Sequence, residues 1–137
     1  MIIGIDLGTT NSLVSVWEGE TAQLVPNALG RMLTPSVVGL DDQGQMVVGD
    51  IARERLQTNP HLTTALFKRH MGSAQATQLG PHRFRPEELS ALVLRSLLAD
   101  AEAVLDLTQL RALRVHLSGA TGGTASLEVD TIRFYRD

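Results

Sequence analysis

The stretch IIGIDLGTTNSLVSVW, residues 2–17, decides the fold. Ile2 to Leu7 is a continuous apolar run, which predicts a strand buried on both faces, and Leu13 to Trp17 predicts a second strand. The turn between them carries a glycine, two threonines and an asparagine at Gly8 to Asn11, directly after Asp6. A turn of this composition either closes a hairpin or holds a ligand, so the neighbouring sequence must decide its role.

Strand and turn patterns continue for the next fifty residues. Ala22 to Val25 predicts a third strand that completes an antiparallel meander. Pro35 to Leu40 and Gln45 to Val48 predict a hairpin in a second, smaller sheet. Asp50 is expected to cap a short helix, and a second helix is expected from Leu62 to about His70.

The clearest helix begins at Pro86 and is expected to run to about Leu105. Proline suits the first helical position, and Glu87 and Glu88 follow it in the first turn, where acids oppose the helix dipole favourably. The apolar residues at helical spacing are Leu89, Leu92, Val93, Leu97, Ala101 and Val104. This stripe predicts a helix that packs on a sheet.

The last thirty residues change character. Leu113 to Leu117 alternates apolar and polar residues, as does the stretch from Leu127 to Val129. Gly119 to Gly123 reads as a loose turn between them, and a shift of parity near Thr131 predicts either a bulge or a twist that moves the strand to another face. We therefore expect an antiparallel hairpin.

Composition limits the class of protein. The chain has 137 residues, 43% of them hydrophobic, which is enough for one core and one domain. Its formal charge of −3 gives no general attraction to nucleic acid or to anionic membranes, and no partner of either kind is expected. Cysteine is absent and apolar runs are short, which favours a cytoplasmic protein without disulfides or membrane spans.

The opening turn has the chemistry of a phosphate site. Gly8 lets the backbone approach a ligand closely, and peptide N–H groups with the side chains of Thr9, Thr10 and Asn11 suit phosphate oxygens. The Asp6 carboxylate would repel phosphate, so its sensible role is to hold a hydrated Mg²⁺. The alternative is an ordinary hairpin turn in which the threonines serve strand propensity.

Four stretches resemble, in the right order, the nucleotide-binding domain of a DnaK-type heat-shock chaperone of the HscC-like branch. They are IIGIDLGTTNS, VPNALGRMLTPSVV, MVVGDIARERLQTNP and ALFKRHMG. The resemblance runs from Met1 to about Leu105. It implies an α/β fold, namely a ribonuclease-H-like, actin-like ATPase lobe with a mixed sheet and an inserted α+β subdomain at about residues 36–84, to which the alternating pattern of the tail adds a C-terminal β-hairpin. Residues 1–105 are then a partial nucleotide-binding lobe, and residues 106–137 complete the same domain.

The resemblance also assigns roles to residues. Asp6 matches the acid that holds the water shell of Mg²⁺, and Gly8 belongs to the loop over the β- and γ-phosphates of ATP or ADP. The other loop residues are Thr9, Thr10 and Asn11. Lys68 matches the lysine placed near the attacking water, a catalytic role. Apart from the resemblance, Lys68 beside Arg69 and His70 fits a solvated surface.

Residues 107–137 depart from the family pattern. They contain no second phosphate loop, catalytic glutamate or adenosine-binding motif, and SGATGGTASLEVDTIRFY weakly resembles the end of a carbohydrate-binding β-sandwich. We expect a truncated or chimeric lobe with at most weak Mg-nucleotide binding and no independent ATP hydrolysis. The alternatives are a chaperone ATPase fragment completed by self-association and a structural or engineered module without a ligand. A homodimer through an exposed edge or apolar surface is expected.

Overall fold

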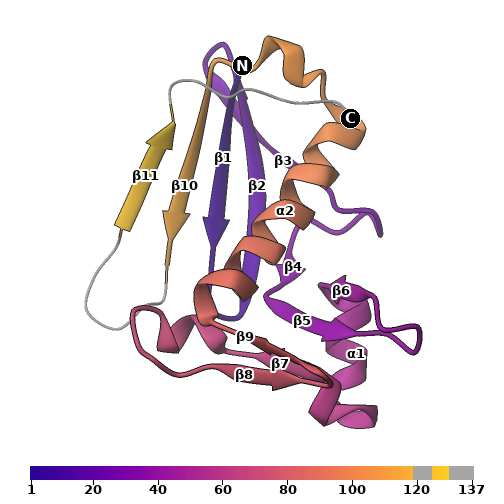
Figure 1. The fold of residues 1–137 in the computed structure, drawn as a ribbon. Coiled ribbons are helices and arrows are strands. Elements are labelled where there is room, and N and C mark those ends of the chain that lie inside the picture. The colour runs from indigo at the N-terminus through magenta and orange to yellow at the C-terminus, as the bar shows by residue number, and fades with distance from the viewer. Residues whose placement is uncertain (119–124, 130–137) are drawn as a thin grey trace.

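The computed structural model describes residues 1–118 and 125–129, and its main element is a mixed sheet (Figure 1). The strands of this sheet are β1 (Ile2–Leu7), β2 (Asn11–Glu18), β3 (Thr21–Val25), β4 (Thr34–Pro35), β10 (Ala112–Leu117) and β11 (Ala125–Val129). Their order is β11-β10-β1-β2-β3, with β4 paired to one end of β2. The sheet therefore joins the beginning of the chain to its last described strand.

The strand directions in the main sheet agree with the antiparallel pairings predicted from the sequence. The strands β1, β2 and β3 pair antiparallel, which confirms the predicted meander. Strand β10 lies parallel to β1, with Ile2 opposite Ala112 and Leu7 opposite Leu117, and β11 pairs antiparallel with β10. The antiparallel pairing of the tail is thus confirmed. The predicted turn at 119–123 and the bulge near Thr131 lie outside the described residues.

Helix α2 (Pro86–Val104) crosses one face of the main sheet (Figure 1). Leu89, Val93 and Leu97 are fully buried beneath it, against Ile3 and Ile5 of β1. Strand alternation explains this packing, because residues 3, 5 and 7 of β1 point to the same face. The stripe is confirmed except at its end, where Val104 is 57% exposed.

A second group of elements lies at one end of the main sheet, in the lower part of Figure 1. It comprises the three-stranded sheet of β5 (Val37–Leu40), β6 (Met46–Val48) and β7 (Thr63–Ala65), helix α1 (Asp50–Thr58), and the hairpin of β8 (Thr77–Leu79) and β9 (His82–Phe84). Short 3-10 turns lie at Pro60–Leu62, Phe67–His70 and, after α2, Leu107–Gln109. The predicted second sheet is confirmed.

The helix predicted from residue 62 to residue 70 is wrong. Thr63 and Thr64 are β-branched and pair with β5, so this stretch becomes strand β7. Leu66 then takes a left-handed conformation with φ of 58°, which ends the strand and starts the 3-10 turn. The consequence is local but important, because this turn carries Lys68.

Asp50 does not cap α1 through its side chain. The cap position is Gly49, and Asp50 is the first helical residue, 7% exposed. Its Oδ1 accepts hydrogen bonds from Arg31 at 2.8 Å and from Arg53 at 2.9 Å. The carboxylate therefore ties the loop after β3 to α1, as a buried charge that is matched by two cations.

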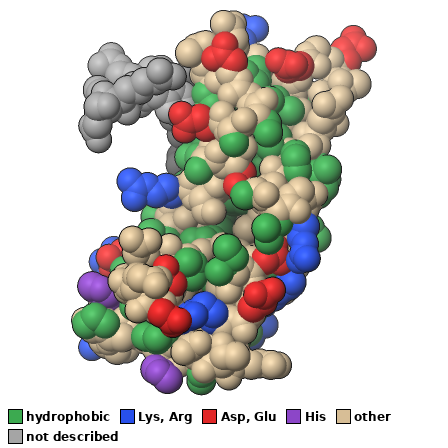
Figure 2. All heavy atoms as spheres, turned by 90° about the vertical axis from the view of Figure 1, so that its right-hand side faces the viewer, with side chains coloured by type: hydrophobic (Ala, Val, Ile, Leu, Met, Phe, Trp, Pro, Cys, Tyr) green, Lys and Arg blue, Asp and Glu red, His purple; other side chains and the backbone are tan. Residues whose placement is uncertain are grey.

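Figure 2 shows the face to the right of Figure 1, where acidic and basic side chains are interspersed rather than segregated by sign. Ion pairs elsewhere in the described residues also join opposite charges, such as Asp50 with Arg31 and Arg53, and Arg55 with Asp42. Within residues 1–118 and 125–129, we find no helix of the length and apolar character that a bilayer crossing requires.

We expect Asp100→Asn to raise the melting temperature at pH 7. Burial against the loop at Ala28 raises the pKa of Asp100, although the backbone N–H of Ala28 acts in the opposite direction. Asp100 therefore has a higher pKa in the folded state than in the unfolded state. Between these two pKa values the folded state binds more protons, so the free energy of unfolding falls as pH rises through that window. Thermal unfolding should show a higher melting temperature for Asp100→Asn than for the parent at pH 7, and no such difference at pH 3. Glu102→Gln, an exposed change on the same helix, should show no such pH-dependent gain.

Candidate functional site

The opening turn joins β1 to β2 with no room for a side chain at its first residue. Gly8 is buried, and a Cβ placed on it would lie 2.0 Å from the backbone oxygen of Asn11. Pairing between the two strands ends at Leu7 and Ser12, immediately on either side of the turn. The chain can therefore reverse this tightly only with glycine at position 8.

Ser36, which lies between β4 and β5, fixes both sides of the turn. Its hydroxyl donates to the carbonyl oxygen of Gly8 at 2.8 Å, and its backbone N–H donates to the carbonyl oxygen of Thr10 at 2.9 Å. The hydroxyl groups of Ser36 and Ser12 are also 2.9 Å apart. Both serines are almost fully buried, so these bonds are shielded from water. The turn is thus held from outside by a second segment of the chain.

The sequence reasoning missed this support. Ser12 and Ser36 carry no obvious chemistry in the sequence. The available signal is that each serine interrupts an apolar strand pattern beside the turn or beside Pro35. A buried hydroxyl in such a pattern needs a hydrogen-bond partner, and here the two serines serve each other and the turn.

Lys68 reaches the same end of the sheet from the 3-10 turn at Phe67–His70. The residue is 3% exposed, and its Nζ donates to the carbonyl oxygen of Leu7 and, at 2.9 Å, to that of Ser118. Burial lowers the pKa of Lys68, while the nearby Asp6 carboxylate acts in the opposite direction. The ammonium group is therefore fixed at the carboxyl ends of β1 and β10, and the surface reading of Lys68 is wrong.

Asp6, the fifth residue of β1, lies beside this ammonium group. It is half-buried, and its Oδ1 accepts a hydrogen bond from the Ser118 hydroxyl at 2.7 Å. The structure thus brings Asp6, Gly8 and Lys68 to one end of the sheet. Thr9, Thr10 and Asn11 line an adjoining cavity of about 170 Å³, which Ser36 and Arg53 also line. Lys68 lies outside the lining of that cavity.

Comparison with protein families settles the ancestry of this arrangement. A family model for the Hsp70 protein matches residues 2–112, from the first residue of β1 to the first residue of β10. The chain belongs to the Hsp70 family. The matched residues correspond to an N-terminal part of the nucleotide-binding domain, the ATPase domain of these heat-shock chaperones, whose members bind ATP and ADP with Mg²⁺. The mixed α/β fold fits an actin-like ATPase lobe.

The donor set of this Hsp70 lobe fits Mg²⁺ better than a metal that needs several side-chain ligands. The described residues hold no group of three or more His, Asp or Glu side chains that could bind a metal ion. Mg²⁺ keeps several of its waters and is commonly bound through one or two carboxylates and substrate phosphates. Asp6 offers one such carboxylate beside the turn, and one of its two oxygens is already bonded to Ser118.

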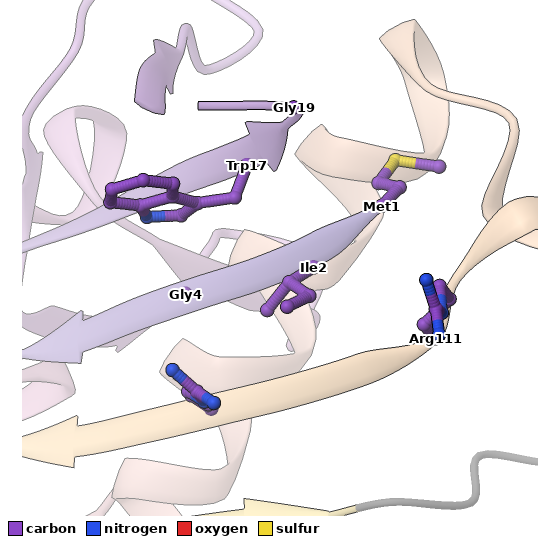
Figure 3. A pocket seen from close by; sticks show the side chains of 7 residues that line it. Met1, Ile2, Gly4, Trp17, Gly19 and Arg111 are labelled. Atoms are coloured by element: carbon purple, nitrogen blue, oxygen red, sulfur yellow. The ribbon is translucent and has the colours of Figure 1, made fainter. Parts of the chain in front are cut away.

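A larger cavity of about 430 Å³ lies near the amino end of β1, on the sheet face opposite α2 (Figure 3). Ile2 and Gly4 of β1, Trp17 of β2 and Arg111 line it, and Trp17 is 47% exposed. The turn at residues 8–11 follows the opposite end of the same strand. The two cavities are therefore separate, and none of the residues with assigned family roles lines the larger one.

Proposed function

We propose that this Hsp70 lobe is a half-site that binds the phosphates of Mg-ADP and Mg-ATP weakly. The observation that carries the proposal is the buried Lys68 ammonium at the end of β1, next to a turn that Ser36 holds on both sides. A rigid turn and a fixed cation bind an anion without a further loss of conformational entropy. In this proposal Asp6 holds the water shell of Mg²⁺, and Gly8 lets the backbone approach the phosphates. The loop residues that contact them are Thr9, Thr10 and Asn11.

We further propose that these 137 residues do not hydrolyse ATP by themselves. Phosphoryl transfer depends on positioning the phosphate, neutralising its charge with metal and orienting the attacking water. The sequence supplies one phosphate loop and one lysine, and that lysine already donates to two carbonyl groups. The bound nucleotide would therefore be held but not turned over.

Isothermal titration of Mg-ADP and Mg-ATP tests the proposed binding. We expect a dissociation constant of about 1 mM, or about −4 kcal/mol, for the parent protein. Asp6→Ala with Thr9→Ala should remove binding while circular dichroism remains unchanged, because neither side chain belongs to the hydrophobic core. Binding by neither protein at millimolar nucleotide would make the turn a plain hairpin connection.

We propose the same division of the chain as the sequence suggests. Residues 1–105 form the partial lobe, with the subdomain inserted at about residues 36–84, and residues 106–137 complete the domain. Support comes from β10 and β11, which extend the sheet beside β1. A cytoplasmic location also remains a proposal, based on the absence of cysteine.

We also propose self-association through β3, the edge strand of the main sheet among the described residues. This strand ends the order of the main sheet, and Leu24 on it is 46% exposed, on the same sheet face as Trp17. An exposed strand edge with apolar side chains is a template for pairing with another chain. Sedimentation velocity should show a dimer that Leu24→Lys reduces to monomer, and a monomeric parent at all concentrations would contradict this proposal.

A further inference from the structure

Ser118 makes three contacts at the proposed phosphate site, although it lies beyond the part of the chain that matches the Hsp70 family. Its backbone N–H donates to the carbonyl oxygen of Leu7 at 3.1 Å. Its hydroxyl donates to Asp6 Oδ1 at 2.7 Å, and its carbonyl oxygen accepts from Lys68 Nζ at 2.9 Å. Ser118 thus forms hydrogen bonds with Leu7 at the end of β1, with the Asp6 carboxylate and with the Lys68 ammonium group.

These contacts place Ser118 between two opposite charges. A lysine has a flexible four-carbon stem, and a carboxylate close to a partly desolvated ammonium group attracts it strongly. Here the Asp6 carboxylate takes the Ser118 hydroxyl as a partner, and the Lys68 ammonium takes two carbonyl oxygens. A direct ion pair between the two side chains would occupy the groups that a cation and a phosphate require.

We propose that Ser118 is a positioning residue that holds Asp6 and Lys68 apart. Its hydroxyl fixes one oxygen of the carboxylate and leaves the other oxygen to a hydrated cation. Its carbonyl keeps the ammonium group at the ends of β1 and β10. The consequence for nucleotide binding rests on the proposed function, whereas the separation of the two charged groups does not.

Ser118→Ala removes the hydroxyl and keeps the backbone carbonyl. The carboxylate of Asp6 then loses its partner and turns toward Lys68, so that a direct ion pair forms. Ser118→Thr keeps a hydroxyl and should preserve the parent arrangement. Ser15→Ala is a matched control, because it also removes a serine hydroxyl that bonds to β1. That hydroxyl donates to the carbonyl oxygen of Gly4 and not to Asp6.

The first test is the carboxylate ¹³Cγ chemical shift of Asp6, measured by NMR at pH 7 without nucleotide. We expect Ser118→Ala to shift this resonance, and Ser118→Thr and Ser15→Ala to leave it at the parent value. An unchanged resonance in a folded Ser118→Ala protein would overturn the positioning role. If the alanine variant does not fold, Ser118→Val replaces it, since valine matches threonine in shape and lacks only the hydroxyl.

The second test is titration of Mg-ADP into the same proteins. Loss of a hydrogen bond to a charged group should weaken binding about tenfold in Ser118→Ala, with recovery in Ser118→Thr. Equal affinity of the alanine variant and the parent would overturn the link to binding. Failure of the parent to bind would instead count against the proposed function, and the ¹³Cγ shift would still decide the role of Ser118.

Discussion

Gly8→Ala is expected to abolish Mg-ADP binding and to lower the free energy of unfolding by about 1–3 kcal/mol. The added Cβ would lie 2.0 Å from the backbone oxygen of Asn11, a distance that no rotamer change relieves because both partners are fixed to the backbone. The turn must therefore open, and it then loses its bonds to Ser36. Urea unfolding and calorimetric titration measure the two effects.

Gly44→Ala is the control for this prediction. Gly44 has φ of 77° at the tip of the β5–β6 hairpin, where a Cβ would meet nothing within 4 Å. Its replacement should cost about 1–2 kcal/mol through backbone strain alone. Binding should nevertheless persist, because the hairpin tip is remote from the turn. If Gly8→Ala binds Mg-ADP as the parent does, the close approach at Gly8 is unrelated to the ligand.

Leu97→Ala is expected to lower the free energy of unfolding by about 2–5 kcal/mol. Leu97 is 1% exposed on the face of α2 that covers the main sheet, so its truncation leaves a cavity between the two layers. A small domain has total stability of only about 5–15 kcal/mol, and this loss consumes much of it. Thermal and urea unfolding should both report the change.

Val104→Ala is the exposed control on the same helix. It separates the effect of losing a buried side chain from the effect of changing helix propensity. Val104 is 57% exposed and lies at the last helical position, so its truncation should change stability by less than about 0.5 kcal/mol. The sequence pattern placed Val104 and Leu97 on one stripe, and the structure separates them. Equal losses in the two variants would show that α2 continues to pack on the sheet as far as its end.

Local patterns predicted the elements whose causes are local. Proline at position 86 with two acids after it defined the start of α2, and the apolar run at Ile2–Leu7 defined β1. The helix expected at residues 62–70 failed because tertiary pairing of Thr63 and Thr64 with β5 outweighed a weak helical pattern. Propensity decides little in a segment that can gain a strand partner.

The candidate site was predictable only in part, because several of its contacts are tertiary and local sequence patterns do not reveal them. The sequence marked Asp6, Gly8 and Lys68 through motif and resemblance. It gave no sign that Ser36 would bond to the turn from 28 positions away, or Ser118 to Asp6 from 112 positions away. Serine is common and carries no pattern of its own, and a contact of such sequence separation follows only from the completed sheet.

The most direct test of a phosphate half-site is an amide chemical-shift map of the ¹⁵N-labelled protein titrated with Mg-ADP. We predict that the shifted amides cluster at residues 8–11, Ser36 and Lys68, where the turn, its support and the fixed cation meet. Shifts confined to the cavity around Trp17 and Arg111, or no shifts at millimolar Mg-ADP, would contradict the account.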